Sequence, residues 1–142
     1  MGLEHWTRFD PEDLLVEALE HWLVVVRRKQ ITLGACVLLL RRPEESLSGL
    51  TAAEAAELPA AAGAFEGRAL AAFQPDKFNY VAAMMKDPYV HFHAFPRYST
   101  DQRRYEVDWH DEAWPRAISL GDLETPEEIL FKVRSDLRSA SL

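Results

Sequence analysis

The sequence has few of the features that mark secreted or membrane-spanning proteins. It contains one cysteine among 142 residues, Cys36, so no disulfide can form within the chain. That favours a reducing, cytoplasmic setting. The longest apolar runs, Trp22–Val26 and Ala35–Leu40, are far too short to span a bilayer. The first residues lack a basic stretch followed by an apolar one, so we expect no signal peptide and no membrane contact.

Positive charge is also scarce. The chain has 16 Lys and Arg residues against 23 Asp and Glu residues, a formal net charge of −7. A protein that coats DNA or RNA needs a basic surface, so we expect no nucleic acid polymer as a partner. A small nucleotide requires only a few local cations and stays compatible with this charge. A hydrophobic content of 48% over this length predicts one folded domain spanning residues 1–142.

Periodicity and turn signals predict an α+β fold, in which an antiparallel sheet of about five strands carries a long helix, with further helices at the ends of the chain. The first helix should begin at Asp10–Pro11, because aspartate caps helices and proline suits the first turn. The long helix should begin at the capping box Thr51–Glu54 and reach about Phe73. Pro59 and Gly63 predict a kink or a late start within it. The last helix should follow Thr125–Pro126, with Ile129, Leu130, Val133 and Leu137 as its apolar face. The expected strands are 24–26, 33–40, 78–84 and 89–97, with a short fifth near 105–109.

The segment Pro88–Tyr98 carries the clearest chemical signal. His91 and His93 lie two residues apart in an apolar run, so a strand places both imidazoles on one face, with Tyr89 and Phe95 beside them. Val90, Phe92 and Ala94 then face the core. We expect the two rings to project from the sheet into an open hollow of the size of a small anion. Two imidazoles next to a phenol suit phosphoryl chemistry or a metal site.

The run Tyr89-Val-His91-Phe-His93-Ala-Phe95-Pro-Arg97 resembles the signature strand of the histidine triad (HIT) family. That signature alternates three histidines with apolar residues and is often followed by Pro-Arg. Two upstream segments, Leu47–Glu54 and Phe78–Tyr80, resemble the family's approach to its long helix and the strand before the signature. The similarity covers about residues 20–98. Residues 1–19 and the C-terminal extension 99–142 fall outside the family pattern.

The resemblance implies a nucleotidyl hydrolase or transferase that acts on a nucleoside phosphate derivative. His91 would be the nucleophile, forming a nucleotidyl-histidine, because a neutral imidazole is a good nucleophile near pH 7. His93 would stabilise developing charge on a phosphoryl oxygen. Tyr89 replaces the first histidine of the triad, and its phenol would donate a hydrogen bond to the leaving group.

The same resemblance implies how the nucleotide is held. Asn79, Lys86 and Arg97 are the candidate phosphate contacts. Met85 stands where many family members have an asparagine, which removes one ordinary phosphate contact. The implied partners are a nucleotide or dinucleotide and a second copy of the chain in a homodimer. No organic cofactor and no metal are implied.

Other interpretations of the same residues stay open. The two histidines are also compatible with half-buried structural roles or with zinc, although no Cys-x-x-Cys or His-Glu-x-x-His motif accompanies them. Arg97 could bind phosphate or pair with an acid. The main alternative function is a catalytically silent nucleotide-binding module, which the replacements at Tyr89 and Met85 favour. A purely structural dimer is a third possibility.

Overall fold

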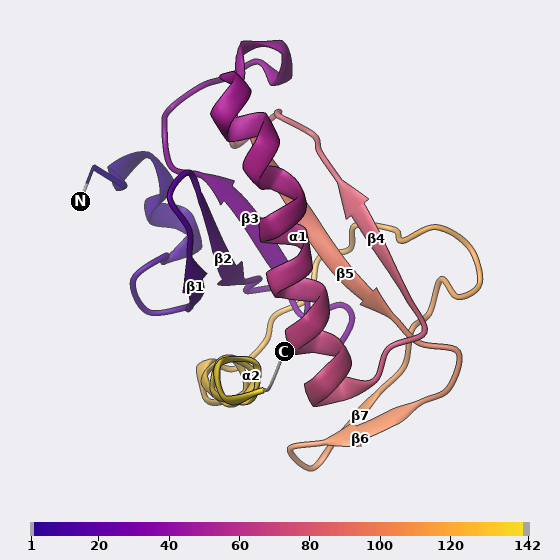
Figure 1. Ribbon diagram of the computed structural model, residues 1–142. Helices are drawn as coiled ribbons and strands as arrows, with labels where there is room; N and C mark the ends of the chain where they lie inside the picture. Colours follow the sequence, from indigo (N-terminus) through magenta and orange to yellow (C-terminus); the bar gives the residue numbers. More distant parts are fainter. Residues whose placement is uncertain (1, 141–142) are drawn as a thin grey trace.

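A five-stranded antiparallel sheet, in the order β1-β2-β3-β5-β4, forms the frame of the molecule (Figure 1). The computed structural model describes residues 2–140. The elements of the frame are the 3-10 helix η1 (Glu4–Phe9), β1 (Leu15–Ala18), β2 (Trp22–Val26), β3 (Cys36–Leu40), the 3-10 helix η2 (Leu47–Gly49), α1 (Ala52–Phe73), β4 (Lys77–Val81), β5 (His91–Arg97) and α2 (Glu127–Ser139). A separate hairpin consists of β6 (Gln102–Arg104) and β7 (Val107–Trp109). The predicted α+β fold with a five-stranded antiparallel sheet is confirmed.

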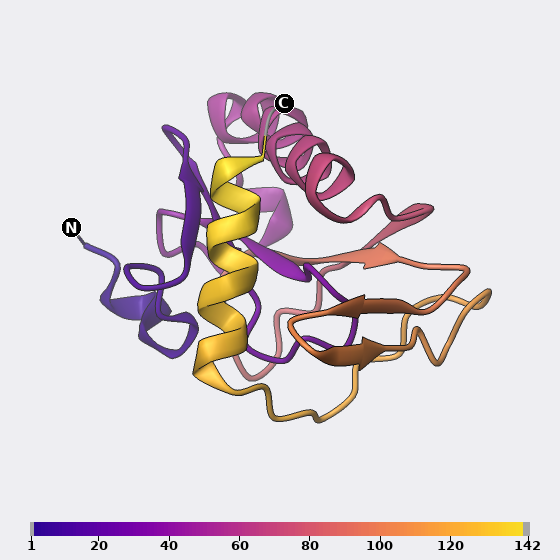
Figure 2. The ribbon, with the colours of Figure 1, turned by 90° about the horizontal axis from the view of Figure 1, so that it is seen from below.

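The two faces of the sheet are covered by different parts of the chain. Both α1 and α2 pack on β2, and the indole of Trp22 donates a hydrogen bond to the carbonyl oxygen of Glu54 at the start of α1. The register places Phe92 and Ala94 of β5 on this face, where Phe92 lies 5.9 Å from the Trp22 ring. The opposite face is covered by η1. In Figure 2, α1 lies above the sheet and the indigo N-terminal segment lies below it.

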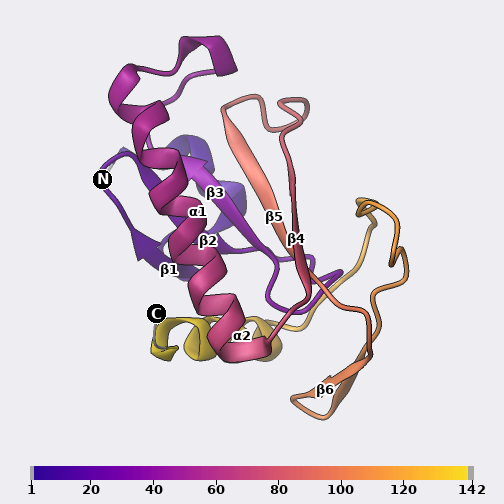
Figure 3. The ribbon, with the colours of Figure 1, turned by 45° about the vertical axis from the view of Figure 1, so that its right-hand side comes forward.

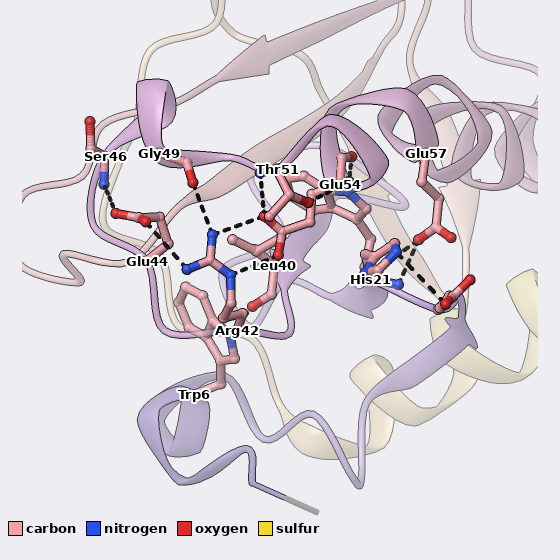
Figure 4. A network of polar contacts seen from close by, with 12 residues as sticks. Trp6, His21, Leu40, Arg42, Glu44, Ser46, Gly49, Thr51, Glu54 and Glu57 are labelled. Carbon is pink, nitrogen blue, oxygen red and sulfur yellow. Dashed lines mark hydrogen bonds and ion pairs between the residues drawn. The ribbon is translucent and has the colours of Figure 1, made fainter.

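The long helix begins where the capping box predicts. The hydroxyl of Thr51 accepts a hydrogen bond from the Glu54 amide, and the Glu54 carboxylate accepts one from the Thr51 amide. The guanidinium of Arg42, which follows β3, forms two 2.9 Å hydrogen bonds with the same carboxylate (Figure 4). The helix then runs unbroken from Ala52 to Phe73, so the predicted late start is wrong. Within residues 2–140, no helix combines the length and apolar character needed to cross a bilayer.

The predicted helix from Asp10 to Trp22 is wrong. Residues 15–18 instead form β1, an edge strand that pairs antiparallel with β2. The backbone at Asp10 has φ 46°, a left-handed conformation that ends η1 and starts no helix. Leu14, Ala18 and Trp22 have the i, i+4 spacing of a helix, but Ala18 belongs to β1 and Trp22 to β2. Leu14 and Val16 are buried in the core, and a bulge at Leu15/Glu17 shifts the register of the strand pair. Sheet pairing across the short β1–β2 turn overrides the local helical signal.

The C-terminal part of the chain follows the sequence more closely. Helix α2 buries Ile129, Leu130, Val133 and Leu137, the four residues predicted as its apolar face. The predicted strand at 105–109 corresponds to β7, but β7 pairs only with β6 and does not join the main sheet. Figure 3 shows this hairpin projecting away from the sheet beyond the end of β5. The fifth strand of the sheet is therefore β1.

Candidate active site

Strand β5 brings the two histidines of the signature segment together on one face. The ring centroids of His91 and His93 lie 4.9 Å apart, with the ring planes at 82°. The partners of these residues on the central strand β3 are Leu39 and Val37, so the histidines stand on a rigid part of the sheet. Phe95 continues the row, 6.3 Å from the His93 ring. The prediction that both imidazoles share one face is confirmed.

The hydrogen bonding of His91 defines its tautomer. Nδ1 of His91 lies 2.7 Å from the carbonyl oxygen of Tyr89. A carbonyl oxygen only accepts hydrogen bonds, so Nδ1 carries a proton and, in the neutral ring, Nε2 carries the lone pair. Within the described residues, Nε2 makes no hydrogen bond. This is the arrangement that a nucleophilic imidazole needs, and the Tyr89 main chain provides it from just before the strand.

The N-terminal segment covers His91. The aromatic rings of Trp6 and Phe9, both in η1, lie 5.5 and 5.6 Å from the His91 ring. The Trp6 indole is held by a 2.6 Å hydrogen bond to the carbonyl oxygen of Leu40 at the end of β3. As a result, His91 is only 2% exposed. The expectation that both imidazoles open into a hollow is wrong for His91, because Trp6 and Phe9 cover its ring. The sequence of residues 1–9 gave no indication of this packing.

His93 is the histidine that reaches a hollow. The cavity has a volume of about 320 Å³, and its lining residues are Arg8, Phe9, Arg27, Arg28, Lys29, Asp87 and His93. Nε of Arg27 donates a 3.2 Å hydrogen bond to Nδ1 of His93. Burial, followed by the charges of Arg27 and His91, lowers the pKa of His93 to about 3. His93 is therefore neutral near pH 7.

The structure places two other sequence candidates near the start of β5. The ring of Tyr89 is half-buried and packs against His5 and Trp6, with centroid distances of 5.2 and 6.0 Å. Lys86 is exposed in the connection between β4 and β5. The predicted roles of Tyr89 as a proton donor and of Lys86 as a phosphate contact stay predictions.

The remaining two candidates, Asn79 and Arg97, belong to an internal network. Nε and Nη2 of Arg97 donate to the two carboxylate oxygens of Asp111 at 2.7 and 2.9 Å, and both side chains are 2% exposed. Nη1 of Arg97 donates to Oδ1 of Asn79 at 2.5 Å, and the Ile118 amide donates to the same oxygen. Of the two open interpretations of Arg97, the pairing with an acid is the one present. A phosphate contact by Arg97 or Asn79 stays a prediction that requires this network to open.

Solved structures of histidine triad proteins have the same fold. A histidine triad protein from Sinorhizobium meliloti matches with a TM-score of 0.72 and 16% identity over 95% of this chain and 94% of its own. One from Bradyrhizobium japonicum matches with a TM-score of 0.69 and 22% identity over 91% of each chain. A hypothetical histidine triad nucleotide-binding protein from Sulfolobus tokodaii matches with a TM-score of 0.66 and 14% identity over 88% of this chain and 80% of its own. The chain therefore has the histidine triad fold.

Comparisons at the level of sequence add no assignment. No family model matches the chain, and no curated protein matches it. The identities to the solved structures are low enough that they establish the fold alone. The chemistry must therefore be argued from the side chains around His91 and His93.

Proposed function

We propose that the chain is a histidine triad enzyme, a nucleotidyl hydrolase or transferase that acts through a nucleotidyl-histidine on His91. The observation that carries this proposal is the hydrogen bond from His91 Nδ1 to the Tyr89 carbonyl oxygen, which leaves Nε2 with its lone pair. The fold, shared with proteins that include one described as nucleotide-binding, supports a nucleotide as the substrate. The substrate class is a nucleoside phosphate derivative.

The reaction proceeds in two displacements. In the first, the lone pair of His91 Nε2 forms a bond to the α-phosphorus, and the bond from phosphorus to the leaving group breaks with its electron pair. The imidazole then carries a positive charge, and its Nδ1–H bond to the Tyr89 carbonyl becomes charge-assisted and stronger. In the second, a water oxygen or another acceptor attacks phosphorus and loses its proton, which restores the Tyr89 phenol that protonated the leaving group, and the electrons of the N–P bond return to Nε2. His93 donates a hydrogen bond to a phosphoryl oxygen, and Tyr89 supplies a proton to the leaving group.

The experiment compares wild-type protein with His91→Ala on two substrates, a nucleoside phosphoramidate and a diadenosine polyphosphate. We expect wild-type protein to release the nucleoside monophosphate from at least one of them. The variant should lose turnover by several orders of magnitude, because it lacks the nucleophile that forms the covalent intermediate. Equal rates in the two proteins would refute the role of His91.

A catalytically silent nucleotide-binding module is the second candidate. The cover of Trp6 and Phe9 over His91 favours it, because a substrate phosphorus must come within about 3–3.5 Å of Nε2 before attack. Under this alternative, nucleotide binding is measurable by calorimetry while turnover stays near zero in both wild-type protein and His91→Ala.

The proposal extends to assembly and location. We propose a homodimer acting in the cytoplasm on a nucleotide or dinucleotide. Sedimentation velocity on the full chain tests the dimer, and a single species at the monomer mass of 16.2 kDa would contradict it.

A further inference from the structure

Arg27 is a buried cation with no carboxylate partner in the described part of the chain. The residue is 8% exposed, although it belongs to the run Arg27-Arg28-Lys29 and runs of like charge usually face solvent. Within residues 2–140, no carboxylate forms an ion pair with its guanidinium. Burial lowers the pKa of Arg27, and no acidic neighbour offsets that effect. Burying an ion is costly unless an opposite charge or several hydrogen bonds compensate, so a lone guanidinium in this position requires an explanation.

The contacts of Arg27 hold it firmly and leave one side of the guanidinium free. Nε donates to His93 Nδ1 at 3.2 Å, and Nη1 donates to the Lys29 carbonyl oxygen at 2.7 Å. The guanidinium carbon lies 5.1 Å from the centre of the Phe95 ring. The main chain of Arg27 is fixed by hydrogen bonds with Gln30 and Ala35. Within the described residues, Nη2 has no hydrogen-bond partner, and Arg27 lines the 320 Å³ hollow.

The other cations of this hollow differ from Arg27, because each already has a carboxylate partner. Arg8 pairs with Asp87 at 3.0 Å. Lys29 pairs with Asp122 at 2.5 Å. Arg28 pairs with both Asp10 and Glu127. Among the described cations that line this hollow, Arg27 is therefore the only one without such a partner, and it is also the most buried of them and lies next to His93.

We propose that Arg27 and His93 together form a binding site for a phosphate-type oxyanion at the inner end of this hollow. Nη2 of Arg27 supplies the charge and one or two hydrogen bonds. His93 supplies the second donor, because its Nδ1 already accepts from Arg27 and its proton must therefore lie on Nε2. Arg27 thus acts both as an anion-binding residue and as the group that fixes the tautomer of His93.

Arg27 is an anion contact that the sequence did not predict, whereas His93 was predicted to contact a phosphoryl oxygen. Arg97 is engaged with both Asp111 and Asn79, whereas Arg27 contacts His93, whose ring lies 4.9 Å from the His91 ring. The identification of the oxyanion as a phosphoryl group of the substrate rests on the proposed function. The existence of an anion site does not, and it can be tested without any turnover.

The experiment is a titration of ¹⁵N-labelled full-length protein with inorganic phosphate near pH 7, followed by NMR of the Arg27 Nε–H and of the histidine rings. We expect saturable shifts at Arg27 and His93 in wild-type protein. R27M should weaken binding roughly tenfold or more, the usual effect of removing a hydrogen bond to a charged group. R27K keeps the positive charge but lacks the planar guanidinium with its several N–H donors, so it should lose less affinity for phosphate than R27M. The control is R103M, since Arg103 is an exposed residue paired with Asp108 in the β6–β7 hairpin.

The same spectra report the tautomer of His93 before any phosphate is added. Wild-type protein and R103M should show the proton on Nε2, and R27M should show a mixture of the two neutral tautomers. If R27M fails to fold by circular dichroism, R27K carries the comparison. The proposal is overturned if phosphate binds R27M, or R27K in its place, as it binds wild-type protein, or if wild-type protein shows no saturable shift at millimolar phosphate.

Activity separates the two proposals. If wild-type protein binds phosphate through Arg27 but releases no nucleotide from either substrate, the anion site stands and the proposed enzyme function is refuted. If wild-type protein turns over and R27M has unchanged kcat and KM, the enzyme function stands and the anion bound at Arg27 is not a phosphoryl group of the substrate.

Discussion

Replacing Asp111 by alanine leaves the guanidinium of Arg97 buried without its carboxylate. In the folded protein the two side chains are joined by hydrogen bonds of 2.7 and 2.9 Å, and both are 2% exposed. The Tyr98 amide, which donates to the same carboxylate at 3.0 Å, also loses its acceptor. The substitution therefore strands one charge and one amide in the interior.

The expected loss of stability follows from this burial. Removing one partner of a buried ion pair typically costs about 3–5 kcal/mol, because the remaining charge stays desolvated. For a chain of this length, each 1 kcal/mol corresponds to roughly 3 °C in Tm, so we expect Tm to fall by roughly 10–15 °C. The matched control is Asp108→Ala, which removes the acid of the exposed Arg103–Asp108 pair, where the two side chains are 63% and 80% exposed. Exposed pairs contribute about 0–1 kcal/mol.

Urea denaturation of wild-type protein, Asp111→Ala and Asp108→Ala measures the difference directly. If Asp111→Ala loses no more stability than Asp108→Ala, the Arg97–Asp111 pair is not structural. Arg97 would then be available as a phosphate contact, and Arg27 would not be the only arginine near the histidines that could bind the anion.

Three further predictions concern the N-terminal cover and two perturbed side chains. Trp6→Ala should destabilise the protein by about 3–5 kcal/mol and expose His91. Hydrogen exchange measures the loss of stability, and the rate of modification by diethyl pyrocarbonate measures the exposure of His91. An unchanged rate of modification would contradict the role of Trp6 as a cover. The hydrogen bonds from Arg42 hold the pKa of Glu54 at about 2, below its unfolded value of about 4.3. This contribution to stability is therefore complete above about pH 4.3 and is lost as the pH falls toward 2, and Glu54→Gln should flatten that part of a stability–pH curve. Burial, the leading cause, lowers the pKa of His93 to about 3, below its unfolded value of about 6.5. The unfolded chain therefore binds the proton first, and the free energy of unfolding should decline as the pH falls below about 6.5. ¹⁵N NMR should find no titration of the His93 ring between pH 5 and 8, and a midpoint inside that range would contradict the burial argument.

Much of the fold was predictable because local signals agreed with the tertiary structure. The capping box at Thr51 and Glu54 and the apolar face of α2 each specify an element through short-range contacts, and both predictions are confirmed. The segment 11–22 shows the limit of this reasoning. Its i, i+4 spacing is typical of a helix, yet pairing with β2 converts residues 15–18 into an edge strand. Pairing of that kind depends on a neighbouring strand and is invisible in a local window.

The candidate site was predictable only along β5. Alternation within a strand places His91 and His93 on one face, which the structure confirms. The parts that sequence reasoning missed come from distant segments. The cover by Trp6 and the contact from Arg27 to His93 join residues 66 or more positions away in the chain, and nothing in the runs around them indicates such contacts. The basic run at 27–29 contains the relevant residue, but that Arg27 is buried while Lys29 is exposed becomes apparent only in the folded chain.

The most direct test of the account is the detection of a covalent intermediate on His91. Wild-type protein and His91→Ala are each mixed with a diadenosine polyphosphate or a nucleoside phosphoramidate, quenched within milliseconds to seconds, and digested for mass spectrometry under mildly basic conditions. The account predicts a nucleoside monophosphate adduct on the peptide that contains His91 in wild-type protein and no adduct in the variant. Turnover by wild-type protein without an adduct at His91, or with the adduct on another residue, would contradict it.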